Sequence, residues 1–247
     1  TYSMAAAETL HQLEQEVGFD IIQFPEYGGE GFVYQTDTTH NRTARYVVQM
    51  HGPLSMFVAC MGWPERDGPF HQIGAFMERM VLHHADKLLA SSWNTARFCG
   101  NTYGINVQEV EVIYSAVNTT LFSPVDPKED TACKALFVGN IVGNKGAETL
   151  VRSIVRLRAS LPGLRLRMIG NGDASYISSL QRILRENDVL DNVEFAGYVP
   201  YTALPEHYGW SDFFVGPSLF EPGPGNIYLE AMACGAPVIA SNASSVP

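Results

Sequence analysis

The sequence predicts an α/β protein built on parallel sheets, and three observations lead to this prediction. Short apolar runs typical of buried strands alternate along the chain with longer amphipathic stretches typical of helices. Loops rich in glycine and proline follow many of the apolar runs. Of the 247 residues, 46% are hydrophobic and 17% are charged, which is typical of a folded globular protein. Strands that alternate with helices in this way pair in parallel.

The first half of the chain begins with a predicted helix over Ala7–Val17. Strands are then expected in "FDIIQF", in "ARYVVQM" before His51, at Lys87–Ala90 and in "VEVIYS". Between them, "MERMVLHHADKLLASS" predicts a helix that runs into the strand at Lys87–Ala90, and "WNTARFCGNTYG" predicts a helix that ends at Gly104.

The second half alternates more regularly. Strands are expected in "KALFVGN", "LRLRMIG", "VEFAG", "DFFVGP" and "PVIAS". Helices are expected in "AETLVRSIVRLRASL", "SYISSLQRILREN", "LPEHY" and the segment that contains Glu230. Five strands alternating with four helices predict a doubly wound, Rossmann-like domain.

The segment "NTTLFSPVDPKEDT" interrupts this pattern with two prolines and four charges. Such a composition is typical of a linker between domains. We therefore predict a first domain over residues 1–124 and a second over 132–247.

The chain is acidic, with a net charge of −10, and the excess lies in its first half. Binding of nucleic acid or of anionic lipid needs clustered Lys and Arg, so no nucleic-acid partner is expected. A weak peripheral membrane contact is possible, but the negative charge of the chain does not support it. The sequence contains no apolar run of the ~20 residues that span a bilayer. Four cysteines without metal-ligand spacing, at 60, 99, 133 and 234, predict buried free thiols in a reducing compartment, and hence a cytoplasmic protein.

The stretch "EPGPGNIYLEAMACGAPVIAS" carries two carboxylates in a pattern typical of a ligand site. Asn226 is the expected N-cap of a helix, Gly235 the expected helix stop and "PVIA" a buried strand. Glu221 then lies in the loop that precedes the helix, and Glu230 lies within it. Both are expected at the carboxyl edge of the sheet, where a helix N-terminus and two acids suit a ligand with phosphates and hydroxyls.

Two further loops follow strands at the same edge. "FVGNIVGNKGAETL" has Gly139, Gly143 and Gly146 around Lys145, a cation suited to phosphate that is expected at the start of the following helix. "IGNGDA" has Gly170 and Asn171. Neither loop fits a strict phosphate-binding motif, so each alone is better explained as an ordinary turn between a strand and a helix. Three such loops at one edge favour a common site.

Taken together, these motifs resemble the C-terminal, donor-binding domain of retaining GT-B glycosyltransferases of family 4. The matching stretches of the second half are "VGNIVGNKG", "MIGNGD", "NVEFAGYVP" and "SDFFVGPSLFEPGPGNIYLEAMACGAPVIAS". The first half resembles the acceptor-binding domain of the family through "DIIQFPEYGGEGF", "VVQMHGP", "HHADKLLASSWNTARF" and "VEVIYSAVNTTLFSP". The resemblance implies two Rossmann-like domains that face a cleft, both incomplete at the chain ends.

The resemblance also implies roles for individual residues. Glu230 would hold the ribose of a sugar-nucleotide donor, Lys145 its diphosphate and Glu221 the hydroxyls of the transferred sugar. His51 matches a histidine that reaches this sugar, so His51, Lys145 and Glu221 are the expected catalytic residues. The remaining expected donor contacts come from Gly139, Asn140, Gly170, Asn171, Tyr198, Val199, Gly225, Asn226 and Ile227, with Tyr198 and Val199 beside the base and Gly225 to Ile227 at the phosphates.

Two departures from the family pattern bear on the donor site. The family usually has an arginine where this chain has Asn140, which removes one partner for the diphosphate charge. Eight residues separate Glu221 from Glu230, whereas the usual motif has seven. The turn therefore carries an extra residue, and the direction of Glu221 is less well fixed than that of Glu230.

The expected reaction is a retaining sugar transfer by front-face attack, because no second carboxylate is placed as a nucleophile. We expect no cofactor and no metal, and His83 and His84 are expected on a helix surface without further metal ligands. The acceptor is not specified. Two alternatives remain open: an epimerase or phosphorylase of the same architecture, and a nucleotide-sugar-binding module that has lost catalysis.

The resemblance begins partway through the acceptor-binding domain and stops before the final elements of the donor-binding domain. On this basis we expect the sequence to be a fragment. We also expect that it does not catalyse transfer by itself, because missing strands leave one wall of the cleft absent.

Overall fold

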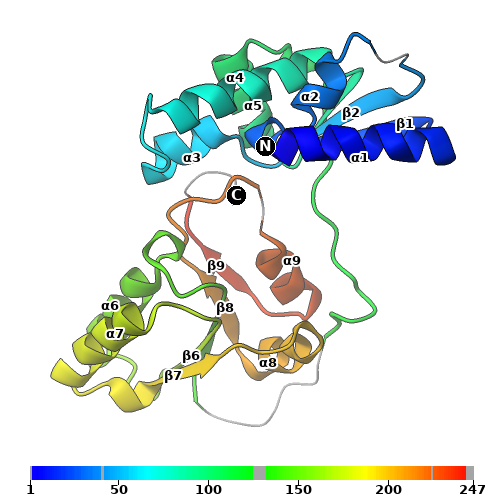
Figure 1. Cartoon of the computed structure of the whole chain (residues 1–247). Coiled ribbons are helices and arrows are strands. Elements are labelled where there is room, and N and C mark those ends of the chain that lie inside the picture. The colour runs from blue at the N-terminus through cyan, green and yellow to red at the C-terminus, as the bar shows by residue number, and fades with distance from the viewer. Residues whose placement is uncertain (1, 40–41, 125–131, 224, 243–247) are drawn as a thin grey trace. The chain divides into compact units, whose positions relative to one another are not determined.

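The computed structural model describes residues 2–39, 42–124, 132–223 and 225–242 and divides the chain into two compact units (Figure 1). The first unit comprises Thr1–Tyr114 and the second Ser115–Pro247. Each unit contains a parallel β-sheet with helices between successive strands. The predicted α/β fold is confirmed for both units.

The sheet of the first unit has the strand order β1-β2-β3-β4, and all neighbours pair in parallel. Its strands are β1 (Ile21–Pro25), β2 (Arg45–Met50), β3 (Lys87–Ala90) and β4 (Val110–Val112). Its helices are α1 (Tyr2–Glu16), α2 (Phe32–Thr36), α3 (Leu54–Met61), α4 (Pro69–His84) and α5 (Trp93–Tyr103). Because all four strands are parallel, their carboxyl ends and the loops that follow them lie at one edge of the sheet.

Local sequence signals explain where α5 begins and ends. Ser92 is its N-cap, and the Ser92 side chain accepts a hydrogen bond from the backbone N–H of Thr95. Gly104 ends the helix with a φ of +75°, a conformation that favours glycine. The predicted end at Gly104 is confirmed.

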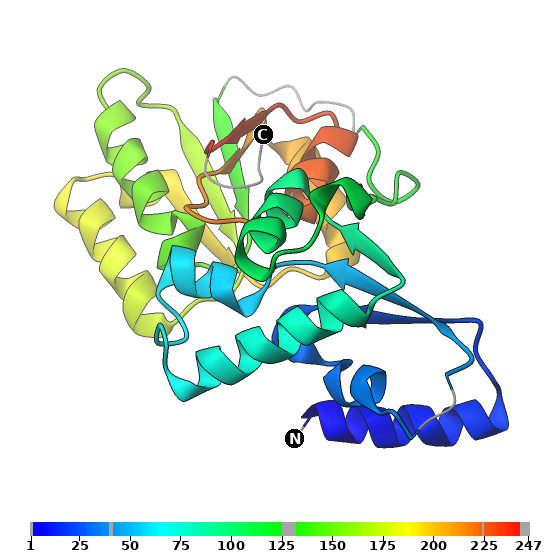
Figure 2. The same ribbon diagram turned by 90° about the horizontal axis from the view of Figure 1, so that it is seen from above.

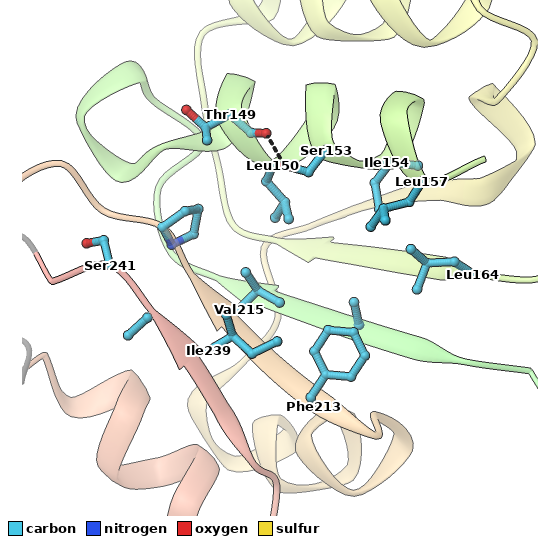
Figure 3. Close-up of a pocket in the computed structure, with 13 residues that line it drawn as sticks. Thr149, Leu150, Ser153, Ile154, Leu157, Leu164, Phe213, Val215, Ile239 and Ser241 are labelled. Carbon is cyan, nitrogen blue, oxygen red and sulfur yellow. Dashed lines mark hydrogen bonds between the residues drawn. The ribbon is translucent and has the colours of Figure 1, made fainter. Parts of the chain in front are cut away.

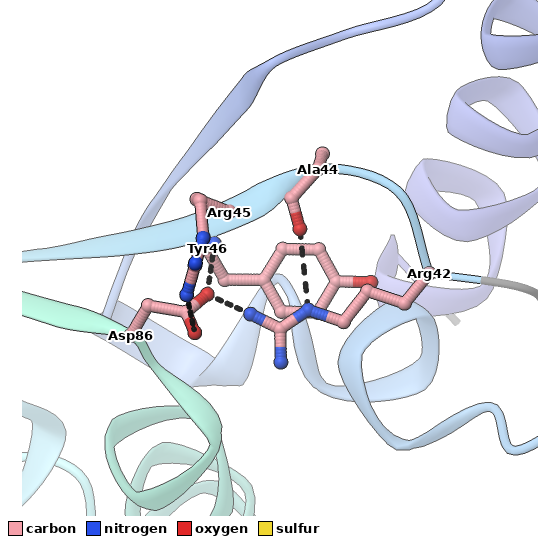
Figure 4. Close-up of polar contacts among 5 residues, drawn as sticks. All are labelled: Arg42, Ala44, Arg45, Tyr46 and Asp86. Atoms are coloured by element: carbon pink, nitrogen blue, oxygen red, sulfur yellow. Dashed lines mark hydrogen bonds and ion pairs between the residues drawn. The ribbon is translucent and has the colours of Figure 1, made fainter.

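The amino end of β2 is fixed by Asp86, which lies between α4 and β3. The Asp86 carboxylate accepts the backbone N–H of Tyr46 at 2.7 Å and pairs with the guanidinium groups of Arg42 and Arg45 (Figure 4). The Arg42 guanidinium also lies 4.1 Å from the centre of the Tyr46 ring. These contacts join the start of β2 to the end of α4, and they lie at the edge of the sheet opposite to His51.

The sheet of the second unit has the strand order β7-β6-β5-β8-β9, again all parallel. Its strands are β5 (Lys134–Val138), β6 (Arg165–Ile169), β7 (Val193–Gly197), β8 (Phe213–Gly216) and β9 (Val238–Ala240). Its helices are α6 (Ala147–Leu157), α7 (Ala174–Glu186), α8 (Leu204–Trp210) and α9 (Asn226–Ala233). In the described residues of this unit, five strands and four helices alternate as predicted.

Two hydrophobic cores cover the two faces of this sheet. Along β5, Ala135 and Phe137 pack with α6 and α7, whereas Leu136 and Val138 pack with α8 and α9. Figures 1 and 2 show the two helix pairs on opposite sides of the strands. All five residues of β5 are buried, because successive side chains of a strand point to opposite faces and both faces are covered.

The boundary between the units lies earlier than the end of the first predicted domain at residue 124. The second unit begins at Ser115. Phe122 explains the difference, because its fully buried ring packs 6.0 Å from the ring of Tyr208 in α8, centre to centre. A proline-rich composition indicates a linker, but it does not reveal which side of the linker an aromatic residue packs against. The predicted linker residues 125–131 lie outside the described part.

The prediction that the "PVIA" strand is buried is wrong for β9. Ile239 and Ala240 are exposed, and β9 is an edge strand in the described sheet order. Beside it, an apolar cavity of about 320 Å³ is lined by Leu150 and Ile154 of α6 and by Val215 of β8 (Figure 3). An apolar run indicates a strand but does not specify what covers it.

The cysteines are free, as predicted, but only some are buried. Cys99 and Cys234 are buried, whereas Cys60 is exposed and Cys133 is half-buried. The prediction of buried thiols is therefore wrong for the latter two. Cys60 lies in the last turn of α3, where neither its neighbours in the sequence nor its residue type reveals which way the helix faces.

Candidate functional site

The strand order of the second unit defines where a ligand would bind. The chain passes from β5 outward to β6 and β7, and then returns to the other side of β5 to form β8 and β9. The loops after β5 and β8 therefore lead away in opposite directions. Open α/β sheets bind ligands at this switch point, outside the carboxyl ends of the strands.

These two loops are packed closely together. A side-chain carbon on Gly146 would lie 2.0 Å from the carbonyl oxygen of Pro217, and Gly146 has a φ of +74°. The backbone N–H of Leu219 donates to the carbonyl of Asn144 at 2.8 Å. Glycine at position 146 is thus required both by its conformation and by the space available.

We predict that Gly146→Ala destabilises the second unit by at least about 2 kcal/mol, because the added carbon meets backbone and the left-handed conformation is strained. Gly143→Ala in the same loop is the control, since no heavy atom lies within 4 Å of the added carbon and its φ is not positive. Thermal and urea unfolding of both variants measure the difference. Equal stability of the two variants would contradict the close packing of these loops.

Lys145 and Glu221 meet across the two loops. The Lys145 Nζ lies 2.6 Å from Glu221 Oε1, and the Ser218 hydroxyl donates to the same oxygen at 2.8 Å. The Lys145 side chain is 27% exposed and that of Glu221 is 7% exposed. Lys145 lies in a 3-10 turn, Gly143–Lys145, before α6 rather than at the helix start where we predicted it. A partly exposed ammonium group beside a buried carboxylate offers a cation to an anionic ligand.

Glu230 is buried in α9, with 3% of its surface exposed. The Tyr208 hydroxyl donates to Glu230 Oε2 at 3.0 Å, and the Tyr201 hydroxyl also bonds to the carboxylate. Burial raises the pKa of Glu230 above its ordinary value, and the two tyrosine hydroxyls act in the opposite direction. This carboxylate is thus positioned by two tyrosine hydroxyls.

The N-cap of α9 is Gly225 rather than Asn226, which is the first helical residue. Gly225 has an extended backbone, and its carbonyl accepts the N–H of Tyr228 at 3.1 Å. A glycine N-cap has no side chain to bond the first N–H groups of the helix. The start of α9 is therefore suited to accept an anion.

Six of the predicted donor-binding residues line one cavity of about 230 Å³ at the carboxyl ends of β5, β6 and β7. These residues are Gly139, Asn140, Gly170, Asn171, Tyr198 and Val199. Tyr201 also lines the cavity, and because it bonds to Glu230 it links the cavity to α9. The Tyr198 ring is 72% exposed and available for stacking.

His51 belongs to the first unit, where it directly follows β2 and is exposed. Its backbone N–H donates to both oxygens of the Glu26 carboxylate, at 2.9 and 2.8 Å. The position of His51 therefore depends on the buried residue Glu26.

The described residues contain no group of three or more His, Cys, Asp or Glu side chains that could hold a metal ion. His83 contacts the carbonyl oxygen of Tyr103 and His84 that of Met80, each through a ring nitrogen. Over the same residues, none of the helices has the length and apolar character needed to cross a bilayer.

Sequence reasoning missed several residues that shape the site. Ser218 binds Glu221, and Tyr201 and Tyr208 bind Glu230. Tyr208 lies in the "LPEHY" segment, which was expected only as a helix, and Tyr201 lies just before that segment. Their spacing of seven residues places them near one another on a helical segment, and this was the available signal.

Comparison with known proteins bears directly on this site. Residues 132–247 match the family model described as Glycosyl transferases group 1. The second unit is therefore similar to the group 1 glycosyl transferases. A GDP-mannose-dependent alpha-(1-6)-phosphatidylinositol monomannoside mannosyltransferase from Mycolicibacterium smegmatis is 34% identical over 116 residues, covering 44% of this chain and 30% of the relative.

Solved structures extend the similarity to both units. Sucrose-phosphate synthase from Thermosynechococcus elongatus aligns with a TM-score of 0.79 and 22% identity, over 96% of this chain and 60% of that protein. Anabaena HepE in complex with UDP aligns with a TM-score of 0.75 and 16% identity, over 97% of this chain and 64% of that protein. These similarities show the GT-B fold. The chain spans less than two thirds of the length of each of these proteins.

Proposed function

We propose that this chain binds a nucleoside-diphosphate sugar and transfers the sugar, with retention of configuration, to an acceptor hydroxyl. The observation that carries the proposal is the single cavity lined by six predicted donor-binding residues, at the same sheet edge as Lys145, Glu221 and the start of α9. The names of similar proteins support a nucleotide-sugar donor, since one is dependent on GDP-mannose and another was solved with UDP.

In the proposed reaction, the nucleoside diphosphate leaves the anomeric carbon of the sugar. Lys145 and the first N–H groups of α9 stabilise the negative charge that develops on the leaving phosphate. Glu221 binds sugar hydroxyls, Glu230 binds the ribose, and His51 contacts the transferred sugar as the family resemblance implies. No metal or cofactor is part of this proposal.

A binding module without catalysis is the second candidate, and two observations favour it. Position 140 carries an uncharged asparagine, and the Lys145 ammonium is already paired with Glu221. Both features lower the positive charge available to a leaving diphosphate.

The test is to incubate the natural protein that contains these residues with radiolabelled UDP-, GDP- and ADP-sugars, with and without acceptors. Formation of a glycoside with the anomeric configuration of the donor supports the proposal. Inversion of configuration would contradict the retaining mechanism. Tight nucleotide binding without release of sugar from any donor would favour the binding module.

A further inference from the structure

The turn between β2 and α3, residues 51–54, has an unusual set of backbone hydrogen bonds. The N–H groups of His51, Gly52 and Leu54 all donate to side-chain carboxylates. Pro53 has no N–H group. Every backbone donor of this turn is therefore held by a carboxylate, and only two carboxylates are involved.

Glu26 holds the first half of the turn. It directly follows β1, and its own N–H donates to the carbonyl of Gln49 in β2. Its side chain is fully buried and accepts the N–H groups of His51 at 2.8 Å and Gly52 at 2.5 Å. The sheet thus fixes the backbone of Glu26, and its carboxylate in turn fixes the residue that carries the His51 imidazole.

Glu78 of α4 holds the second half. Its fully buried carboxylate accepts the N–H of Leu54, the first residue of α3, at 2.8 Å and the N–H of Gly28 at 2.9 Å. It also accepts the hydroxyl of Tyr103 in α5. One side chain therefore connects the loop after β1, the start of α3 and the end of α5.

Burial of two carboxylates costs free energy of folding, which argues against incidental packing. Burial raises the pKa of Glu26 to about 7 and also raises the pKa of Glu78. The Glu78 carboxylate also opposes ionisation of Glu26, and both carboxylates add to the effect of burial in raising the pKa of the Cys99 thiol in α5. In the part of the chain that the structure describes, no lysine or arginine pairs with either carboxylate. Buried charges without ionic partners are characteristic of functional regions.

We propose that Glu26 and Glu78 are positioning residues that hold the turn at 51–54 as a carboxylate clamp and thereby set the place of the His51 side chain for sugar transfer. The role in transfer rests on the proposed function, whereas the clamp itself does not. A carboxylate accepts several N–H groups at once, and a protonated carboxyl group accepts them less well. Protonation of Glu26 as the pH falls should therefore loosen the turn.

The first test is a series of ¹H–¹⁵N NMR spectra of the chain between pH 5 and 8.5. The amide signals of residues 51 and 52 are followed in a His51→Gln background, so that the imidazole does not contribute. They are expected to move together with one midpoint above pH 6, and the further change Glu26→Gln should abolish this transition. Asp86→Asn is the matched control, because Asp86 accepts a backbone N–H at the opposite end of the same strand. Amide signals that do not titrate, or that still titrate in Glu26→Gln, would overturn the clamp.

The second test is kinetic and uses the natural protein that contains these residues. Glu26→Gln and Glu78→Gln should each lower kcat at least tenfold while the KM for the donor and the Kd for the nucleotide stay unchanged. Glu26→Gln should also flatten the acidic limb of the dependence of kcat on pH. An unchanged kcat would overturn the positioning role. If the parent transfers no sugar from any donor, the proposed function fails and the positioning role fails with it, whereas the NMR result still decides the clamp.

Discussion

Lys145→Ala is expected to lower the rate of sugar transfer about 100-fold, the effect of removing one group that stabilises charge in a transition state. The Lys145 ammonium is partly exposed and lies in the loop after β5, at the sheet edge where the leaving diphosphate is proposed to bind. The measurement is the single-turnover rate with a radiolabelled donor, taken together with the melting temperature.

The pairing of Lys145 with Glu221 complicates this variant, because the alanine leaves a buried carboxylate without its cation. The double variant Lys145→Ala with Glu221→Gln separates the two effects when it is compared with Glu221→Gln alone, because Glu221 itself is proposed to bind the sugar. It should recover the melting temperature lost in Lys145→Ala, while the transfer rate stays low. Recovery of both quantities would show that Lys145 serves stability alone.

Glu230→Gln is expected to weaken nucleotide binding by about 1 to 3 kcal/mol, or about 5- to 150-fold in Kd, because a charged hydrogen-bond acceptor is lost. The pKa of Glu230 is raised by burial, so its charged fraction falls as the pH is lowered toward this pKa. Affinity of the parent should therefore decrease on acidification, and the affinity of Glu230→Gln should depend less on pH.

Calorimetric titration with UDP, GDP and ADP between pH 5 and 8 measures both effects. Glu206→Gln in α8 is the matched control, since Glu206 is an exposed glutamate of the same unit. If all three nucleotides bind Glu230→Gln as tightly as they bind the parent, Glu230 does not contact the ribose.

Much of the second unit could be predicted from sequence because its apolar runs and helix signals are local. The cavity could also be anticipated, because the residues that follow parallel strands share an edge of the sheet. The start of α4 was missed because Pro69 indicates a break, although proline is also favoured in the first turn of a helix.

Contacts between distant residues could not be predicted in this way. Lys145 and Glu221 are separated by 76 positions, and nothing in either loop specifies that their side chains pair. Glu26 and Glu78 have ordinary sequence surroundings, and only the structure shows that both are buried against the turn at 51–54. Burial of a charged residue depends on packing of the whole unit, which local patterns do not encode.

The cavity at the carboxyl ends of β5, β6 and β7 is proposed to hold the nucleotide of a sugar donor. The most direct test of this proposal is to follow ¹H–¹⁵N NMR signals of the chain during titration with UDP and GDP. The amides of Gly139, Gly170 and Val199, which line this cavity, should shift most and saturate with at least one nucleotide. Shifts confined to the separate cavity beside Asn192 and Trp210, or no saturable shift with either nucleotide, would contradict the proposal.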